Sequence, residues 1–107
     1  MAESKNKIIA DIKKFYDQIR DTYKVKRIFL YGSHAKGTAK SGSDIDVGIV
    51  IEGLEKMDEI KVLSQLYSFT KNVNTLIEPF CISYKEYKKP VRASILEGII
   101  KSGIVVV

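Results

Sequence analysis

The sequence predicts an α+β fold, a layered domain in which a small mixed β-sheet is flanked by helices. Helical spacing of apolar residues over 3–23 and 55–73 interleaves with short apolar runs at 26–31, 45–51 and 75–83. Such interleaving is typical of layered domains built from both element types. The 107 residues are the size of one domain, so we expect residues 1–107 to form a single domain with one core.

The first half of the chain supplies a helix and two strands. Residues 3–23 form an amphipathic helix whose core face recurs at spacings of three and four: Ile8, Ile9, Ile12, Phe15, Tyr16, Ile19 and Tyr23. The run KRIFLY at 26–31 is bounded by Gly32 and predicts a strand. The run IDVGIVI at 45–51 is apolar almost throughout, as expected of a strand covered on both faces.

The second half repeats the pattern. Residues 55–73 return to helical spacing with an apolar face of Met57, Ile60, Leu63, Leu66, Tyr67 and Val73. Residues 75–83 predict a third strand, and Pro79 places it at a sheet edge or at a bulge because proline cannot donate to a ladder. Residues 84–102 predict two short helices broken at Pro90, and the tail GIVVV predicts a final short strand.

Composition and net charge limit the kinds of ligand, cross-link and membrane segment that we expect in this protein. The net charge of +5 suits an anionic ligand such as a nucleotide, or equally a solvated surface. The single cysteine, Cys81, excludes an internal disulfide and is expected to be a small core residue. We see neither a signal peptide nor an apolar stretch of membrane-spanning length, so we expect a cytoplasmic protein without a membrane partner.

Two carboxylates stand where the second strand begins. Asp44 and Asp46 are two residues apart, so in an extended chain they project to the same side with Cα atoms roughly 7 Å apart. Two ionised carboxylates this close repel unless a cation lies between them, and oxygen ligands favour Mg²⁺, with Mn²⁺ as a second choice. The alternative is that Asp44 caps a turn while Asp46 points into solvent.

The loop before these acids and a later strand extend the pattern. Gly32 and Ser33 follow a strand and open the segment SHAKG, which can make one helical turn and hold phosphate oxygens. The alternative is that Ser33 merely caps that turn. Glu78 interrupts an apolar strand, and it reaches the same site if this strand lies beside 45–51. Otherwise Glu78 is an exposed residue next to Pro79.

These residues resemble the nucleotidyltransferase superfamily that includes DNA polymerase β. The spacing from Gly32-Ser33 to Asp44-Ile45-Asp46 is most similar to the minimal nucleotidyltransferases, which are encoded beside a HEPN partner. The resemblance implies a nucleotidyltransferase fold with Asp44, Asp46 and Glu78 as catalytic residues and metal ligands. It implies that Gly32 and Ser33 grip the phosphates of a nucleotide. We also expect Lys36 and Ser43 to contact the nucleotide. Lys36 or Lys40 can reach the β- or γ-phosphate; the alternative is that these lysines only keep the loop soluble. The family more often carries Asp at the position of Glu78, and Arg is frequent where His34 and Lys36 stand.

The resulting hypothesis is an Mg²⁺- or Mn²⁺-dependent enzyme that transfers NMP, AMP from ATP above all, to a hydroxyl acceptor. The resemblance further implies an antitoxin that modifies a HEPN-domain toxin within a homo- or hetero-oligomer. The alternative is a partner-binding module that neutralises a toxin by contact alone. We expect no direct nucleic-acid ligand, because we see no aromatic–basic interleaving and no recognition helix. The lone histidine, His34, is expected to be a surface residue, and Tyr31 a core residue.

Overall fold

A four-stranded mixed sheet organises the chain. The computed structural model describes residues 4–92 and 94–107. The strand order is β3-β2-β1-β4, with β1 at Val25–Tyr31, β2 at Ile45–Ile51, β3 at Ile77–Ser83 and β4 at Ile104–Val105. Strand β1 is antiparallel to β2 and to β4, whereas β2 and β3 are parallel. The predicted α+β class and all four predicted strands are confirmed.

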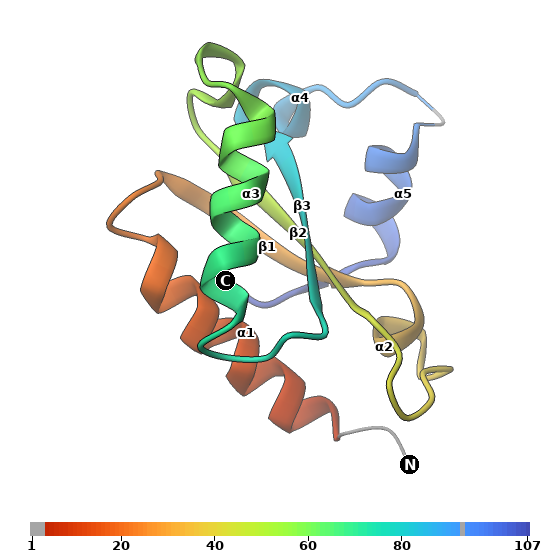
Figure 1. The fold of residues 1–107 in the computed structure, drawn as a ribbon. Coiled ribbons are helices and arrows are strands. Elements are labelled where there is room, and N and C mark those ends of the chain that lie inside the picture. The colour runs from red at the N-terminus through yellow and green to blue at the C-terminus, as the bar shows by residue number, and fades with distance from the viewer. Residues whose placement is uncertain (1–3, 93) are drawn as a thin grey trace.

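Helices cover both faces of this sheet (Figure 1). Helices α1 (Lys5–Ile19) and α3 (Glu59–Thr70) pack on one face, and α5 (Ile95–Ser102) packs on the other. The short helix α2 (Ser33–Lys36) follows β1, and α4 (Tyr84–Lys88) follows β3 at the opposite end of the sheet. The two predicted helices on either side of Pro90 are thereby confirmed, although residue 93 lies outside the described residues. No helix in the described ranges is long and apolar enough to cross a membrane.

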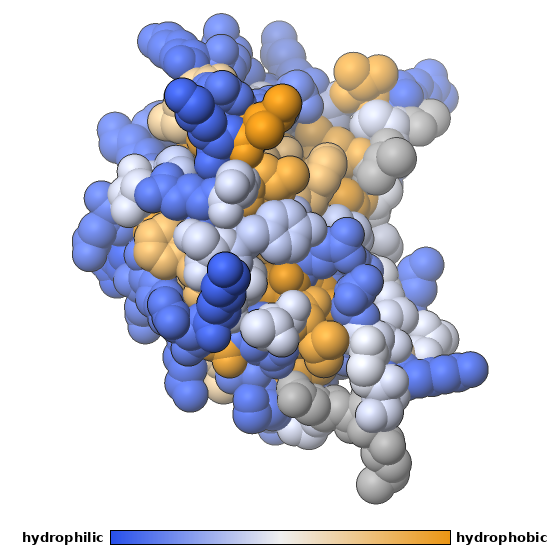
Figure 2. All heavy atoms as spheres, viewed as in Figure 1, coloured by the Kyte–Doolittle hydropathy of each residue, from blue (hydrophilic) through white to orange (hydrophobic). Residues whose placement is uncertain are grey.

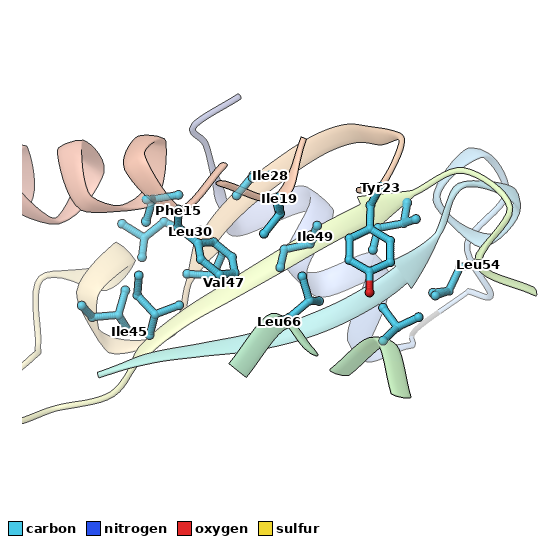
Figure 3. Close-up of a cluster of buried hydrophobic side chains, with 14 of the residues drawn as sticks. Phe15, Ile19, Tyr23, Ile28, Leu30, Ile45, Val47, Ile49, Leu54 and Leu66 are labelled. Atoms are coloured by element: carbon cyan, nitrogen blue, oxygen red, sulfur yellow. The ribbon is translucent and has the colours of Figure 1, made fainter. Parts of the chain in front are cut away.

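The alternation of side chains along the strands divides the core into two clusters. Residues 45, 47, 49 and 51 of β2 point toward α1 and α3, where Phe15, Ile19 and Leu66 meet them (Figure 3). The smaller cluster on the other face joins Phe29, Val50 and Ile82 to Leu96 and Ile99 of α5. Because both faces of β2 are covered, its near-continuous apolar run is explained.

The first helix is shorter than the sequence predicts. Ser4 caps α1 by accepting a hydrogen bond from Lys7 N at 3.2 Å, and the helix ends at Ile19. Residue 3, where the helix was predicted to begin, lies outside the described residues. Tyr23 is nevertheless buried, because the turn after α1 brings its ring against the sheet and its hydroxyl donates to Gln65 of α3.

The predicted helix at 55–73 is divided in two. Residues Leu54–Lys56 form a 3-10 turn, and Asp58 then starts α3 by accepting from Ile60 N at 3.1 Å. This restart turns the stripe of Val62, Leu66 and Thr70 toward the sheet. The predicted apolar face was therefore wrong at Ile60, which is 82% exposed.

Strand β3 is an edge strand, as Pro79 predicted. The carbonyl of Leu76 accepts from Ile45 N at 2.8 Å, so residue 76 and the even-numbered residues after it present their backbone groups to β2. Pro79 is odd-numbered, so its nitrogen faces away from β2, on the side of β3 that has no neighbouring strand. The missing N–H therefore removes no hydrogen bond from the sheet. This arrangement protects the edge against pairing with another strand.

A buried carboxylate fixes the start of β3. Asp11 of α1 is 2% exposed and accepts hydrogen bonds from Lys7 Nζ at 2.6 Å and from Asn74 Nδ2 at 3.0 Å. Asn74 in turn accepts from Leu76 N at 3.0 Å. Burial alone raises the pKa of Asp11, but the hydrogen bonds from Lys7 and Asn74 and the nearby lysine charges outweigh it and hold the pKa below its usual range. Helix α1 thus anchors the turn that delivers Glu78.

Candidate active site

The strand register brings the predicted acids together. Asp46 is the second residue of β2, and it lies opposite Tyr31 in β1 and beside Glu78 in β3. Asp44 stands just before β2 and is exposed. Asp44 and Asp46 are two residues apart and so share a side, and Glu78 shares it because it is in register with Asp46. All three carboxylates therefore belong to the face that α5 covers only in part. The expectation that the strand of Glu78 lies beside 45–51 is confirmed.

The three carboxylates influence one another electrostatically. A hydrogen bond with Asp44, then partial desolvation and the charges of Asp44 and Asp46, raise the pKa of Glu78. Burial and the charge of Asp44 raise the pKa of Asp46, and His34 opposes part of that rise. The hydrogen bond at Glu78 and burial at Asp46 are the largest causes of these pKa shifts, and the neighbouring like charges add to both. A bound cation would relieve this repulsion between the carboxylates.

Gly32 makes room for Asp46. Its backbone has φ 73° and ψ −151°, a combination that is almost confined to glycine. A Cβ added at Gly32 would overlap Asp46 Oδ2 and lie 3.1 Å from its Cγ. The carboxylate therefore rests directly against the glycine at the end of β1, and no larger residue fits between them.

The predicted nucleotide-binding residues have different surroundings. Ser33 opens α2, and its hydroxyl makes no hydrogen bond with any described residue. Lys36 ends α2 with an exposed side chain. Ser43 instead builds the loop, since its Oγ accepts from Lys40 N at 2.9 Å. Ser33 and Lys36 thus keep polar groups available for a ligand, whereas the hydroxyl of Ser43 is already engaged.

His34 is buried, contrary to the expectation of a surface residue. It is 8% exposed, and its Nε2 donates to the carbonyl of Ser43 at 3.2 Å. The same histidine lines a pocket of about 160 Å³ together with Lys40, Ser41, Gly42, Ser43, Ile45 and Leu76. A helix of four residues is too short for periodicity to reveal which side chain turns inward. His34 ties α2 to the loop that carries Asp44.

Two tyrosines border the acids. The ring of Tyr31 lies over Gly48, where an added Cβ would be 3.8 Å from Cε1. Burial and the charges of Asp46 and Glu78 raise the pKa of Tyr31 to about 12. Burial, then Glu78 and both aspartates, raise the pKa of Tyr67 on α3 as well. The sequence pattern had predicted both rings as core residues, so their place beside the acids was missed.

The three carboxylates fit a hard divalent ion whose remaining ligands come from a substrate and from water. Within the described ranges, no three His, Cys, Asp or Glu side chains form a ready-made set of metal ligands. Mg²⁺, however, is commonly held by one or two carboxylates, with phosphate oxygens and water completing its shell. Asp44, Asp46 and Glu78 supply the oxygen chemistry that this mode requires.

Comparison with known proteins identifies the family. The model of the nucleotidyltransferase domain matches residues 12–104. Two curated relatives from Methanocaldococcus jannaschii carry the name "putative protein adenylyltransferase". One is 33% identical over 103 residues, which cover 91% of this chain and 96% of that protein, and the other is 36% identical over 62 residues, which cover 58% and 69%.

Solved structures show the same fold. The crystal structure of a "putative nucleotidyltransferase" from Sulfolobus solfataricus superposes with a TM-score of 0.65 at 17% identity, over 98% of this chain and 89% of that one. A chain from a toxin–antitoxin structure with AMP-PNP superposes with a TM-score of 0.55 at 21% identity, over 92% and 72%. From the family match along most of its length and from the related M. jannaschii sequence, this chain belongs to the nucleotidyltransferase domain family.

Proposed function

We propose that this nucleotidyltransferase moves AMP from ATP to a hydroxyl group on a partner protein, with Mg²⁺ or Mn²⁺ as the required ion. The observation that carries the proposal is the convergence of Asp44, Asp46 and Glu78 at one end of the sheet. The names of the M. jannaschii relatives support a protein as the acceptor. The resemblance to minimal nucleotidyltransferases supports a HEPN-domain toxin as that acceptor, with this chain as a cytoplasmic antitoxin.

The residues of the site have different roles in the proposed reaction. Gly32, Ser33 and Lys36 hold the triphosphate, and Asp44, Asp46 and Glu78 would hold the divalent ion. When bound, that ion neutralises phosphate charge and stabilises the attacking and leaving oxygens. The acceptor oxygen forms a bond to the α-phosphorus, the bond from that phosphorus to the bridging β-phosphate oxygen breaks, and pyrophosphate leaves. The hydroxyl proton passes to a carboxylate oxygen of Glu78, which is the exposed member of the site on β3.

A second candidate function is neutralisation of a toxin by contact alone. It is favoured by an apolar groove of about 180 Å³ between α3 and β3, lined by Glu59, Ile60, Leu63, Phe80 and Cys81. Figure 2 shows apolar residues reaching the surface along this junction. An exposed apolar groove of this kind is typical of a surface that a partner covers.

Label transfer separates the two candidates. The protein is incubated with Mg²⁺, ATP labelled at the α-phosphate and the product of an adjacent gene. The double variant Asp44→Asn/Asp46→Asn is expected to lose at least about 100-fold in transfer rate, because charge stabilisation of the transition state is removed. Asp17→Asn, an exposed acid of α1, is the matched control and should keep full activity.

The enzyme hypothesis and the contact hypothesis predict different results in this experiment. Transfer by the wild type and by Asp17→Asn but not by the double variant supports the enzyme. If none of the three proteins transfers label while all three still neutralise the partner, the contact hypothesis replaces it.

A further inference from the structure

Two segments near the end of the sheet away from Asp44 and Asp46 are rich in basic residues, although Glu52 and Glu55 also lie at that end. Residues 24–31 contain three basic residues and no acidic one, and residues 84–92 contain four basic residues and one acidic. Since the net charge of the whole chain is +5, the remaining residues carry slightly more acids than bases. Strand β3 separates the two ends, and its seven residues span roughly 20 Å. Figure 1 shows α4 and α2 at opposite ends of the sheet.

Two lysines from distant parts of the sequence meet at one aromatic ring. Lys26 Nζ lies 5.1 Å from the ring centre of Tyr84, and Lys88 Nζ lies 4.7 Å from it. Both distances are within the range of cation–π attraction. The fold thus places basic side chains of β1 and α4 around one aromatic ring, although they are far apart in the sequence.

The rings themselves are anchored in the core. Tyr84 stacks on Tyr87 with ring centres 6.3 Å apart, and Tyr87 lies 5.9 Å from Phe29. Phe29 belongs to the buried cluster beneath α5. Because Tyr84 packs against Tyr87 and already has two ammonium groups near its ring, its role is to position charge.

These lysines have no acidic partner in the described part of the chain. None of Lys26, Lys85, Lys88 and Lys89 makes a salt bridge there, in contrast to Lys24, which pairs with Glu52 at 3.2 Å. The surface therefore presents several unneutralised ammonium groups on a rigid base. We call these four lysines, together with Tyr84, the α4 basic surface.

We propose that the α4 basic surface binds the phosphodiester backbone of a nucleic acid, independently of base sequence. Protein–protein interfaces depend on an apolar centre with aromatic anchors. Here Val91 is the one large apolar side chain of residues 84–92 that is strongly exposed, and the tyrosines are half-buried. A basic surface without an apolar centre is better suited to binding a phosphate backbone than to binding another protein. This site is separate from the proposed transferase site and uses none of its residues.

The test measures binding of a fluorescein-labelled single-stranded RNA of about 20 nucleotides, and of the DNA of the same sequence, by anisotropy. With four phosphate contacts the expected slope of log affinity against log salt is about −2.8, so affinity falls about 50-fold between about 50 and about 200 mM salt. The variant Lys26→Gln/Lys88→Gln/Lys89→Gln should fall only about threefold over the same range. RNA and DNA should bind within a few fold of each other, because the contacts are to phosphate.

The matched control loses the same charge elsewhere. Lys13→Gln/Lys61→Gln/Lys71→Gln removes three exposed lysines from α1 and from the region of α3. It should keep nearly the wild-type salt slope, and circular dichroism checks that both triple variants are folded. Equal weakening by the two triple variants, equal competition by polyglutamate, or no binding at about 50 mM salt would overturn the proposal. A further variant, Tyr84→Leu, should weaken binding because the ring that holds Lys26 and Lys88 is lost.

Discussion

The contact between Gly32 and Asp46 allows a quantitative test of the candidate site. Replacing Gly32 by alanine forces a side chain into a backbone conformation that costs about 1–3 kcal/mol for residues other than glycine. The added Cβ also overlaps Asp46 Oδ2, and such overpacking costs about 1–3 kcal/mol. The two effects together amount to about 2–6 kcal/mol, a large part of the 5–15 kcal/mol that is usual for a domain.

A matched variant and a double-mutant cycle separate the two effects. Gly37 has φ 78°, and no atom lies within 4 Å of a Cβ placed there, so Gly37→Ala should cost only the backbone strain of about 1–2 kcal/mol. In an Asp46→Ala background the oxygen that meets the new Cβ is gone. The double variant Gly32→Ala/Asp46→Ala should therefore be more stable than the sum of the single changes predicts, by about 1–3 kcal/mol.

Urea unfolding of the wild type and the four variants measures these free energies, and label transfer from ATP measures activity. Gly32→Ala should lose transfer because Asp46 is displaced, whereas Gly37→Ala should retain it. If Gly32→Ala does not fold, its recovery in the Asp46→Ala background carries the same information. Additivity of the two changes within about 0.5 kcal/mol would show that the glycine does not act through the carboxylate. Equal loss of transfer in Gly32→Ala and Gly37→Ala would show that loop strain alone explains the effect.

Three other predictions concern the fold around the site. Because the pKa of Asp11 is lowered on folding, its carboxylate stabilises the protein above its unfolded pKa, and this stability is lost as pH falls below about 4. The urea midpoint should therefore fall less between pH 5 and pH 3 in Asp11→Asn than in the wild type. His34→Ala removes a buried donor to the carbonyl of Ser43 and should cost about 1–3 kcal/mol in thermal unfolding; no loss would mean that water replaces the contact fully. Ile60→Ser should change stability by less than about 0.5 kcal/mol, whereas Leu66→Ala should cost about 2–5 kcal/mol. A cost of Ile60→Ser as large as that of Leu66→Ala would restore the predicted helix face, which contains both residues.

The strands of this protein could be predicted because their signals are local. A run such as 45–51 needs only its own apolar residues to identify a strand covered on both faces. Pro79 predicted a sheet edge or a bulge for 75–83, and the structure shows the edge. The acids were found for the same reason, since Asp44 and Asp46 break an apolar run at a spacing that fixes their common side. Their grouping with Glu78 depended on the hypothesis that the strand of Glu78 lies beside 45–51, and the register of β2 and β3 confirms that hypothesis.

What the sequence did not reveal depends on contacts between distant segments. The apolar stripe of α3 was misassigned because Asp58 restarts the helix, and a three-to-four spacing fits two adjacent stripes equally well until one of them meets the sheet. The burial of His34 depends on the carbonyl of Ser43, nine residues later. The meeting of Lys26 with Tyr84 joins segments almost sixty residues apart, beyond the reach of any periodicity.

The candidate site works against the stability of the fold that holds it. Asp46 is partly buried beside two other carboxylates, and the raised pKa values of Asp46 and Glu78 show that their charged forms are disfavoured. The start of β3, the strand that carries Glu78, is fixed by contacts outside the site. The hydrogen bonds that Asp11 accepts supply this fixation from the opposite face of the sheet. The two acids thus have opposite effects: the pairing of Asp11 stabilises the folded chain, whereas the crowding of Asp46 beside Asp44 and Glu78 opposes it, a repulsion that the divalent ion of the proposed function would offset.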